Sequence, residues 1–159
     1  MRLLPEQREN RAIKSHLDID LKEVYLPVGR MLQIDHVRSI EEGVIVCEQN
    51  LLDRQWLFDI HFPDDPIFPG SFMIEGAGQA VAIWMWKGGI RGKPRLLKAT
   101  AEFKSPVVPQ DELLTYTAKI QKRQNICIGA VTVTVRQRLA ANIEIWLAVV
   151  SSNGQRPAG

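Results

Sequence analysis

The feature that most constrains the fold of this chain is an apolar segment near its middle, from Gly70 to Lys87. We expect this segment to be a helix, and apolar residues occupy all of its sides rather than one stripe. A helix of this kind has to be covered all round by the rest of the chain. It is short for a membrane span and holds Glu75 and Gln79, so a buried helix of a folded domain is expected.

The rest of the chain supplies strands for that cover. Apolar and small residues alternate from Ile126 onward, which is the period of a sheet, and we expect this strand to continue to Leu139. Further strands are expected at residues 98–104, 113–123 and 143–151, and a hairpin over residues 31–47 around a Glu42-Gly43 turn. The joins, including Gln124-Asn125 and residues 140–142, are short, which favours antiparallel neighbours. The sequence therefore predicts an α+β fold in which a curved antiparallel sheet of about five or six strands wraps one long buried helix.

Three prolines lie between Trp56 and Gly70, and they predict an extended, structured loop there. Residues 25–152 are expected to form the domain. Residues 1–24 are expected to form a polar N-terminal arm, helical or loose, and residues 153–159 a C-terminal tail. The N-terminal residues carry charges throughout and have no apolar core, so we expect no secretory signal or membrane anchor and a cytoplasmic location.

Charge and cysteine content narrow the function classes. A formal net charge of +2 is too small to argue for nucleic-acid binding, and no nucleic-acid-binding motif is present. Cys47 and Cys127 lie far apart with no second ligand type spaced for a metal. Both are expected to be buried thiols of a reducing compartment.

Two residues stand out as a candidate acid and base. Glu75 is a carboxyl group in an apolar helix, and burial favours its protonated form, which suits a general acid. The alternative is a structural residue bonded to Gln79 one turn on, and helix position alone does not decide between them. His61 comes just before the prolines, where a rigid backbone would hold an imidazole that serves as a base near neutral pH. A structural histidine is the alternative.

The run from His61 to Ala80 resembles the active-site segment of bacterial 3-hydroxyacyl-acyl-carrier-protein dehydratases, with His-Phe-Pro, then Pro-Gly, then a helix bearing Glu and Gln. A second block, residues 101–111 with the sequence AEFKSPVVPQD, resembles a stretch that follows the helix in that family. The resemblance covers residues 26–151.

The resemblance implies a hot-dog fold and removal of water from a 3-hydroxyacyl thioester on acyl carrier protein, giving the trans-2-enoyl product, in fatty acid or polyketide-type biosynthesis. It also implies a homodimer in which His61 meets Glu75 of the partner subunit; assembly into a trimer of dimers is left open. No metal and no cofactor beyond the phosphopantetheine of the carrier are expected.

The family also implies supporting roles. The Gly70 amide would receive the thioester carbonyl, which also suits the free N–H groups and partial positive charge of a helix N-terminus. Gln79, Pro69 and Ile67 are expected to support the site. A further group of residues, mostly aromatic residues and glycines, either lines an acyl tunnel or only packs in the core: Phe68, Phe72, Gly76, Gly78, Trp84, Met85 and Phe103.

Some positions depart from the family pattern. Asp64 stands where the family has Gly, and it would be tolerated there even if the backbone needed positive φ. Asp64 and Asp65 are interpreted as turn residues rather than a metal pair. Gly76 and Gly78 cost the helix about 1 kcal/mol each, so we expect either room for a bulky or polyene acyl chain or close approach of a strand.

A basic run is a candidate docking patch for an acidic carrier protein, with a solvated loop as the alternative; its residues are Arg91, Lys93, Arg95 and Lys98. Three other functions remain as alternatives. A hot-dog thioesterase also has a carboxylate on the central helix but generally lacks the His-Phe-Pro and Pro-Gly pair. A second type of hydratase needs Asp five positions before His, where Trp56 stands. A non-catalytic acyl-carrier binding module would not need His61, Gly70 and Glu75.

Overall fold

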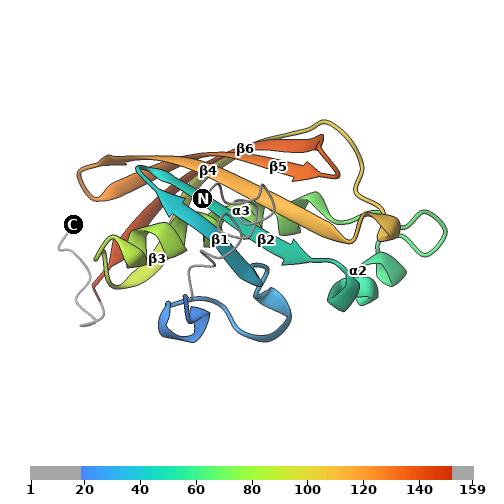
Figure 1. Cartoon of the computed structure of the whole chain (residues 1–159), viewed down its shortest axis with the longest axis horizontal. Helices are drawn as coiled ribbons and strands as arrows, with labels where there is room; N and C mark the ends of the chain where they lie inside the picture. Colours follow the sequence, from blue (N-terminus) through green and yellow to red (C-terminus); the bar gives the residue numbers. More distant parts are fainter. Residues whose placement is uncertain (1–18, 152–159) are drawn as a thin grey trace, which may run out of the picture.

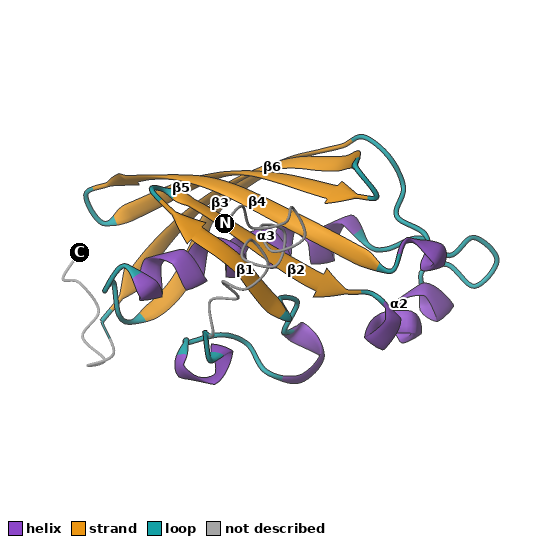
Figure 2. Cartoon of the chain, viewed as in Figure 1, coloured by secondary structure: helices purple, strands orange, loops and turns teal. Residues whose placement is uncertain are grey.

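The chain folds around helix α3 (Gly70–Lys87), which lies against the inner face of a curved sheet (Figure 1). The structure is a computed structural model and describes residues 19–151. All neighbouring strands are antiparallel, in the order β1-β2-β4-β5-β6-β3 (Figure 2). The strands are β1 (His36–Glu41), β2 (Val44–Asn50), β3 (Lys93–Phe103), β4 (Leu113–Arg123), β5 (Ile126–Val135) and β6 (Arg138–Val150). The predicted sheet wrapped around one long helix is confirmed.

Small residues let α3 approach the sheet closely. A Cβ added at Gly76 would lie 2.5 Å from the Tyr116 hydroxyl of β4, and one added at Gly129 of β5 would lie 2.5 Å from Val81 of the helix. Half of the helix is fully buried, but Glu75 and Gly78 are only half-buried. The expectation of burial on every side is therefore wrong for the face that carries Glu75, because that face borders a cavity described below.

The strands alternate between core and surface as a half-buried sheet requires. In β4 the buried positions are Leu114, Tyr116, Ala118 and Ile120, and in β2 they are Ile45, Cys47 and Gln49. The predicted bounds of β4 and the Glu42-Gly43 turn match the structure.

Several predicted strand boundaries are wrong. The chain turns between β5 and β6 at Arg136 and Gln137, which both have positive φ, instead of at residues 140–142. Neither is a usual residue for that conformation, so no sequence signal marks the turn. β3 begins at Lys93 rather than at residue 98, and β1 begins at His36, after the 3-10 turn η2 (Gly29–Met31) and an irregular segment over residues 32–35.

A short helix, α2 (Gln55–Ile60), takes the first part of the expected proline loop. It follows the 3-10 turn η3 (Leu52–Arg54) and buries Leu57 and Phe58. The prolines exclude helix only from Pro63 onward, so the true loop is residues 61–69.

Part of the expected arm packs on the domain. A 3-10 turn, η1 (Leu21–Glu23), leads to Val24, which is buried in the core. The rest of the arm, residues 1–18, and the tail, residues 153–159, lie outside the described residues. Within residues 19–151, no helix has the length and apolar character to span a membrane.

Candidate active site

His61 caps the end of α2 and is tied to the far side of the loop. Its Nδ1 lies 3.1 Å from the carbonyl oxygen of Ile67, and the Ile67 amide donates to the His61 carbonyl at 2.9 Å. A carbonyl only accepts, so Nδ1 carries the hydrogen of this bond. In the neutral ring, Nε2 then has a free lone pair, which is the form that takes up a proton.

The loop between His61 and the helix is closed by backbone bonds. Phe62 and Asp65 exchange two N–H···O bonds of 3.1 Å, so the two aspartates sit in a turn, as expected from their residue type. Among the described residues, Asp64 is not one of the positions with positive φ, so its replacement of Gly needs no special backbone. The Phe68 amide donates to the Val107 carbonyl at 2.8 Å. The second sequence block, residues 101–111, therefore holds the loop in place.

Gly70 occupies the first position of α3, after Pro69 as N-cap. An amide at this position has no partner within its own helix and points beyond the helix end. The ring of Phe103 lies over Gly70, and a Cβ there would be 2.6 Å from the ring. A side chain at position 70 would therefore displace the exposed Phe103 ring, whereas glycine lets the ring lie against the helix start.

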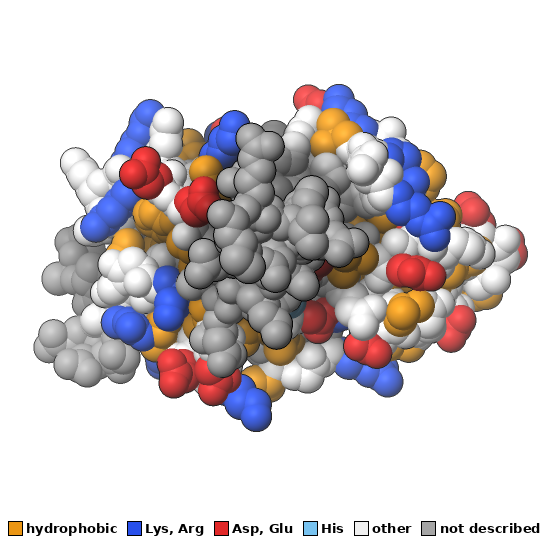
Figure 3. All heavy atoms as spheres, viewed as in Figure 1, with side chains coloured by type: hydrophobic (Ala, Val, Ile, Leu, Met, Phe, Trp, Pro, Cys, Tyr) orange, Lys and Arg blue, Asp and Glu red, His pale blue; other side chains and the backbone are white. Residues whose placement is uncertain are grey.

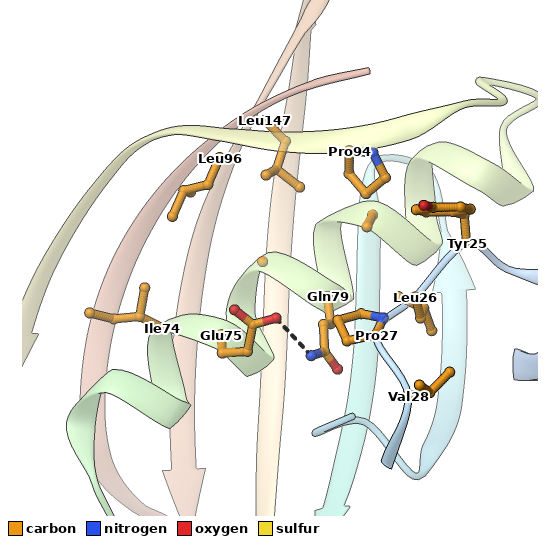
Figure 4. Close-up of a pocket in the computed structure, with 12 residues that line it drawn as sticks. Tyr25, Leu26, Pro27, Val28, Ile74, Glu75, Gln79, Pro94, Leu96 and Leu147 are labelled. Carbon is orange, nitrogen blue, oxygen red and sulfur yellow. Dashed lines mark hydrogen bonds between the residues drawn. The ribbon is translucent and has the colours of Figure 1, made fainter. Parts of the chain in front are cut away.

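Glu75 is paired with Gln79 one turn along α3. Gln79 Nε2 donates to Glu75 Oε1 at 2.9 Å and to the Met31 carbonyl at 2.8 Å, while Gln79 Oε1 accepts from the amides of Gln33 and Ile34. The Glu75–Gln79 bond expected of a structural pair is present. It does not exclude catalysis, because the second carboxyl oxygen of Glu75 points away from Gln79 (Figure 4).

Glu75 lies at the edge of a mainly apolar cavity of about 390 Å³ (Figure 4). The helix contributes Ile74, Glu75, Gly78, Gln79 and Ala82, the sheet contributes Pro94, Leu96 and Leu147, and the segment before η2 contributes Tyr25, Leu26, Pro27 and Val28. His61 is not among the residues that line it. The described chain thus brings Glu75, Gly78 and Gln79 together and leaves His61 outside the cavity.

The residues considered as tunnel walls fall into different places. Gly78 lines the cavity, and a Cβ there would meet nothing within 4 Å. Gly76 instead faces Tyr116, so close packing explains it. Phe68 and Met85 are buried in the core, Phe72 packs edge-on against Trp56 with ring centres 6.3 Å apart, Trp84 packs against the core, and Phe103 is exposed over Gly70.

The basic run lies on the surface at the start of β3 and just before it. Arg91 stacks on Trp86 at 4.3 Å from the ring centre, and Lys98 lies over Trp146 at 5.1 Å. Arg95 is exposed and Lys93 half-buried. On the face in Figure 3, the described residues show basic and acidic side chains interspersed, with no single basic surface.

Burial perturbs three groups. It raises the pKa of the Cys47 thiol to about 12, raises the pKa of the Cys127 thiol, and raises the pKa of the Tyr116 hydroxyl far above its usual range. These groups stay protonated at neutral pH, so the two cysteines are inert thiols in the fold.

Sequence reasoning missed the wall formed by Tyr25 to Val28 and the buried polar residues Gln33, Gln49 and Tyr116. Gln49 gave a signal: it takes an inward position in the alternation of β2, after Ile45 and Cys47, where a polar residue needs a partner. The wall residues carried no comparable signal.

Three comparisons place these features among known proteins. The FabA-like domain matches residues 26–144. The 3-hydroxyacyl-[acyl-carrier-protein] dehydratase FabZ of Clostridium perfringens is 32% identical over 133 residues, which is 82% of this chain and 96% of that protein.

Among solved structures, the dehydratase heterocomplex ApeI:P of Xenorhabdus doucetiae aligns with a TM-score of 0.63 at 16% identity, over 82% of this chain and 91% of that one. A mutant thioesterase of Staphylococcus aureus aligns with a TM-score of 0.58 at 17% identity, over 81% of this chain and 96% of that one. These two likenesses confirm the hot-dog fold and carry no information on activity. The match to the FabA-like domain and the identity to FabZ show that this chain belongs to the FabA-like family of hot-dog dehydratases.

Proposed function

We propose that this chain removes water from 3-hydroxyacyl thioesters carried on acyl carrier protein, with His61 as general base and Glu75 as general acid. The observation that carries this assignment is the bond from His61 Nδ1 to the Ile67 carbonyl, because it leaves the Nε2 lone pair for substrate. Glu75 complements it, because its free carboxyl oxygen borders an apolar cavity that suits an acyl chain.

The chemistry balances with these two groups. Nε2 of His61 takes the proton from C2, the electrons of the C2–H bond form the C2–C3 double bond, and the C3–O bond breaks as Glu75 protonates the leaving hydroxyl to give water. The Gly70 amide stabilises the charge that develops on the thioester oxygen. The proton that His61 took from C2 then passes to Glu75, directly or through solvent, so that His61 is neutral and Glu75 protonated for the next cycle.

A homodimer with shared sites accounts for the separation of the two residues. Among the described strands β3 is an edge strand that pairs with β6 alone, and it exposes Leu96, Leu97 and Phe103. An edge strand with an exposed apolar row favours pairing with a second copy. Phe103 covers Gly70, so such a pairing would bring the partner close to the start of α3.

The same proposal includes the setting of the reaction. The substrate arrives as a thioester on the phosphopantetheine of the carrier, and Arg91, Lys93, Arg95 and Lys98 are the docking candidates on this surface. The pathway is fatty acid or polyketide-type biosynthesis, and the location is the cytoplasm. The chemistry above uses no further cofactor.

The test is complementation between two inactive variants. We expect His61→Ala and Glu75→Gln each to lower dehydration by at least about a hundredfold, measured as loss of water from 3-hydroxyacyl-ACP by mass spectrometry. After subunit exchange of an equal mixture, activity should return to about a quarter of wild type, because half of the dimers are mixed and each mixed dimer has one intact site.

Three results would contradict parts of the proposal. Near-normal turnover of either single variant would remove that residue from the mechanism. Verified exchange without recovery would place His61 and Glu75 in one chain. Release of the free acid and carrier thiol, instead of the enoyl product, would identify a thioesterase.

A further inference from the structure

A set of hydrogen bonds runs from strand β4 to Glu75 through buried side chains and the backbone amide of Gln33. The Tyr116 hydroxyl donates to Gln49 Oε1 at 2.6 Å, and Gln49 Nε2 donates to Gln33 Oε1 at 2.6 Å. The Gln33 backbone amide donates to Gln79 Oε1 at 2.8 Å, and Gln79 donates to Glu75. The four residues behind Glu75 are all buried, so water does not compete for these bonds.

The direction of the bonds is fixed at the end near η2. Gln33 Nε2 donates to the carbonyls of Arg30 and Met31 at 3.0 and 3.1 Å. Carbonyls only accept, so the Gln33 amide cannot turn over, and its oxygen has to face Gln49. Gln49 therefore presents its NH₂ group to Gln33 and its oxygen to Tyr116.

The Tyr116 end of the set is consistent with this direction of the hydrogen bonds. Burial raises the pKa of Tyr116, so its hydroxyl keeps the proton that it donates to Gln49. Within residues 19–151, every buried side-chain nitrogen and oxygen has a partner. A single arrangement therefore satisfies all members of the set.

Gln79 is held in one orientation for the same reason. Its oxygen accepts from the amides of Gln33 and Ile34, so its NH₂ group has to face the Met31 carbonyl and Glu75. Oε1 of Glu75 always receives an N–H hydrogen, and a proton on that oxygen would oppose it. The proton of a neutral Glu75 consequently sits on Oε2, which points away from Gln79 (Figure 4).

We propose that Tyr116, Gln49 and Gln33 are positioning residues that fix the backbone at Gln33, whose amide holds Gln79 as a donor to Glu75, so that Oε2 is the oxygen that delivers the proton. This inference rests on the proposed role of Glu75 as general acid. Gly76 supports it independently, because a Cβ there would lie 2.5 Å from the Tyr116 hydroxyl. The glycine next to Glu75 makes room for the residue that anchors the set.

Kinetics provide the first test. Tyr116→Phe removes the terminal donor and keeps the ring, and we expect kcat to fall by roughly tenfold with KM unchanged within about twofold. In a Gln79→Leu background, the same change should cause no further loss of kcat, because Tyr116 acts through Gln79. Thr132→Val is the matched control: it also removes one hydroxyl donor, to the Thr117 carbonyl on β4, and should leave kcat unchanged.

A second test needs no substrate. Exchange of the Gln79 side-chain amide protons, followed by NMR, should be slow in the wild type and about tenfold faster in Tyr116→Phe, but unaffected in Thr132→Val. If Tyr116→Phe does not fold, the double variant Tyr116→Phe/Gln49→Met serves instead, since replacing both partners by apolar groups is close to neutral for stability.

The outcomes separate the two proposals. Unchanged exchange in Tyr116→Phe, or additive losses of kcat with Gln79→Leu, would overturn the positioning role. Slow exchange that Tyr116→Phe accelerates, in a protein without dehydratase activity, would refute the proposed function and leave the hydrogen-bonded set standing.

Discussion

At the scale of single residues, two glycines in one helical turn have different causes. Gly76 faces β4, and Tyr116 occupies the space that a side chain at Gly76 would need. Gly78 faces the cavity and has open space where a side chain would be. Both lower the intrinsic stability of α3, yet only Gly76 gains packing in return. The cost of Gly78 is therefore accompanied by open space at the cavity rather than by packing.

This difference predicts opposite effects of the same substitution. Gly78→Ala should raise stability by about 0.5–1 kcal/mol, because alanine favours the helix and meets no neighbour. Gly76→Ala should lower stability by about 1–3 kcal/mol through overpacking against Tyr116. Thermal unfolding of both variants measures the pair of shifts.

Activity measurements test whether the open space at Gly78 is used by substrate. Gly78→Ala should lower kcat/KM for the longest or bulkiest acyl chains and spare the short ones, because its methyl group enters the cavity. A stable Gly78→Ala protein with the wild-type chain-length profile would show that the space at residue 78 is not used by substrate.

At the scale of elements, the connection between β3 and β4 is fastened by one buried carboxylate. Asp111 closes the 3-10 turn η4 (Pro109–Asp111), where its Oδ2 accepts from the Val108 amide at 2.8 Å and from Arg138 of β6 at 2.9 Å. Asp111 is buried, whereas Arg138 is partly exposed. The same connection supplies the Val107 carbonyl that holds Phe68, so it links the sheet to the loop of His61.

Removing this carboxylate should loosen the connection. We expect Asp111→Ala to lower the free energy of unfolding by about 2 kcal/mol, because the Val108 amide and Arg138 lose a buried acceptor. Urea unfolding measures the change. Glu102→Ala breaks the exposed ion pair with Lys104 and should leave stability unchanged. Equal losses in both variants would mean that burial of Asp111 does not matter.

At the scale of the whole molecule, the domain has an exposed apolar edge on its sheet and a cavity that holds only one of the two proposed acid–base residues. The described β3 edge exposes apolar side chains, and the cavity that holds Glu75 lacks His61. Leu96 belongs to both features, since it lines the cavity and is 54% exposed. Pairing of two copies along this edge would cover the exposed apolar side chains and complete the site at the cavity.

A charge on this edge should therefore separate the subunits. Leu97, which is 53% exposed on β3, is the position to change. Leu97→Arg should shift the protein from dimer to monomer in sedimentation velocity and reduce dehydration in parallel, because each site needs two chains. Leu113→Arg introduces the same charge at an exposed leucine of the interior strand β4 and should remain dimeric. An active Leu97→Arg monomer would contradict shared sites.

The sequence by itself determined the central helix, the bounds of β4 and the family. An apolar helix has to be wrapped, and a strict alternation of side chains can only be a strand, so these elements are encoded locally. The spacing of His61, Gly70 and Glu75 is local for the same reason, because one loop and the start of one helix carry all three residues.

Only the tertiary structure decided which surfaces face each other. The turn at Arg136 and Gln137 lacks the usual turn residues, whereas Ala140 and Ala141, which the sequence pattern predicts in the join, lie in the core on β6. Gly76 and Gly78 have different roles because they point in different directions around one helix, and the amino-acid sequence does not show what lies in each direction. The hydrogen bonds from Tyr116 to Gln79 join three elements, β4, β2 and α3, through the segment before β1, and their directions depend on which carbonyls and amides the fold brings together.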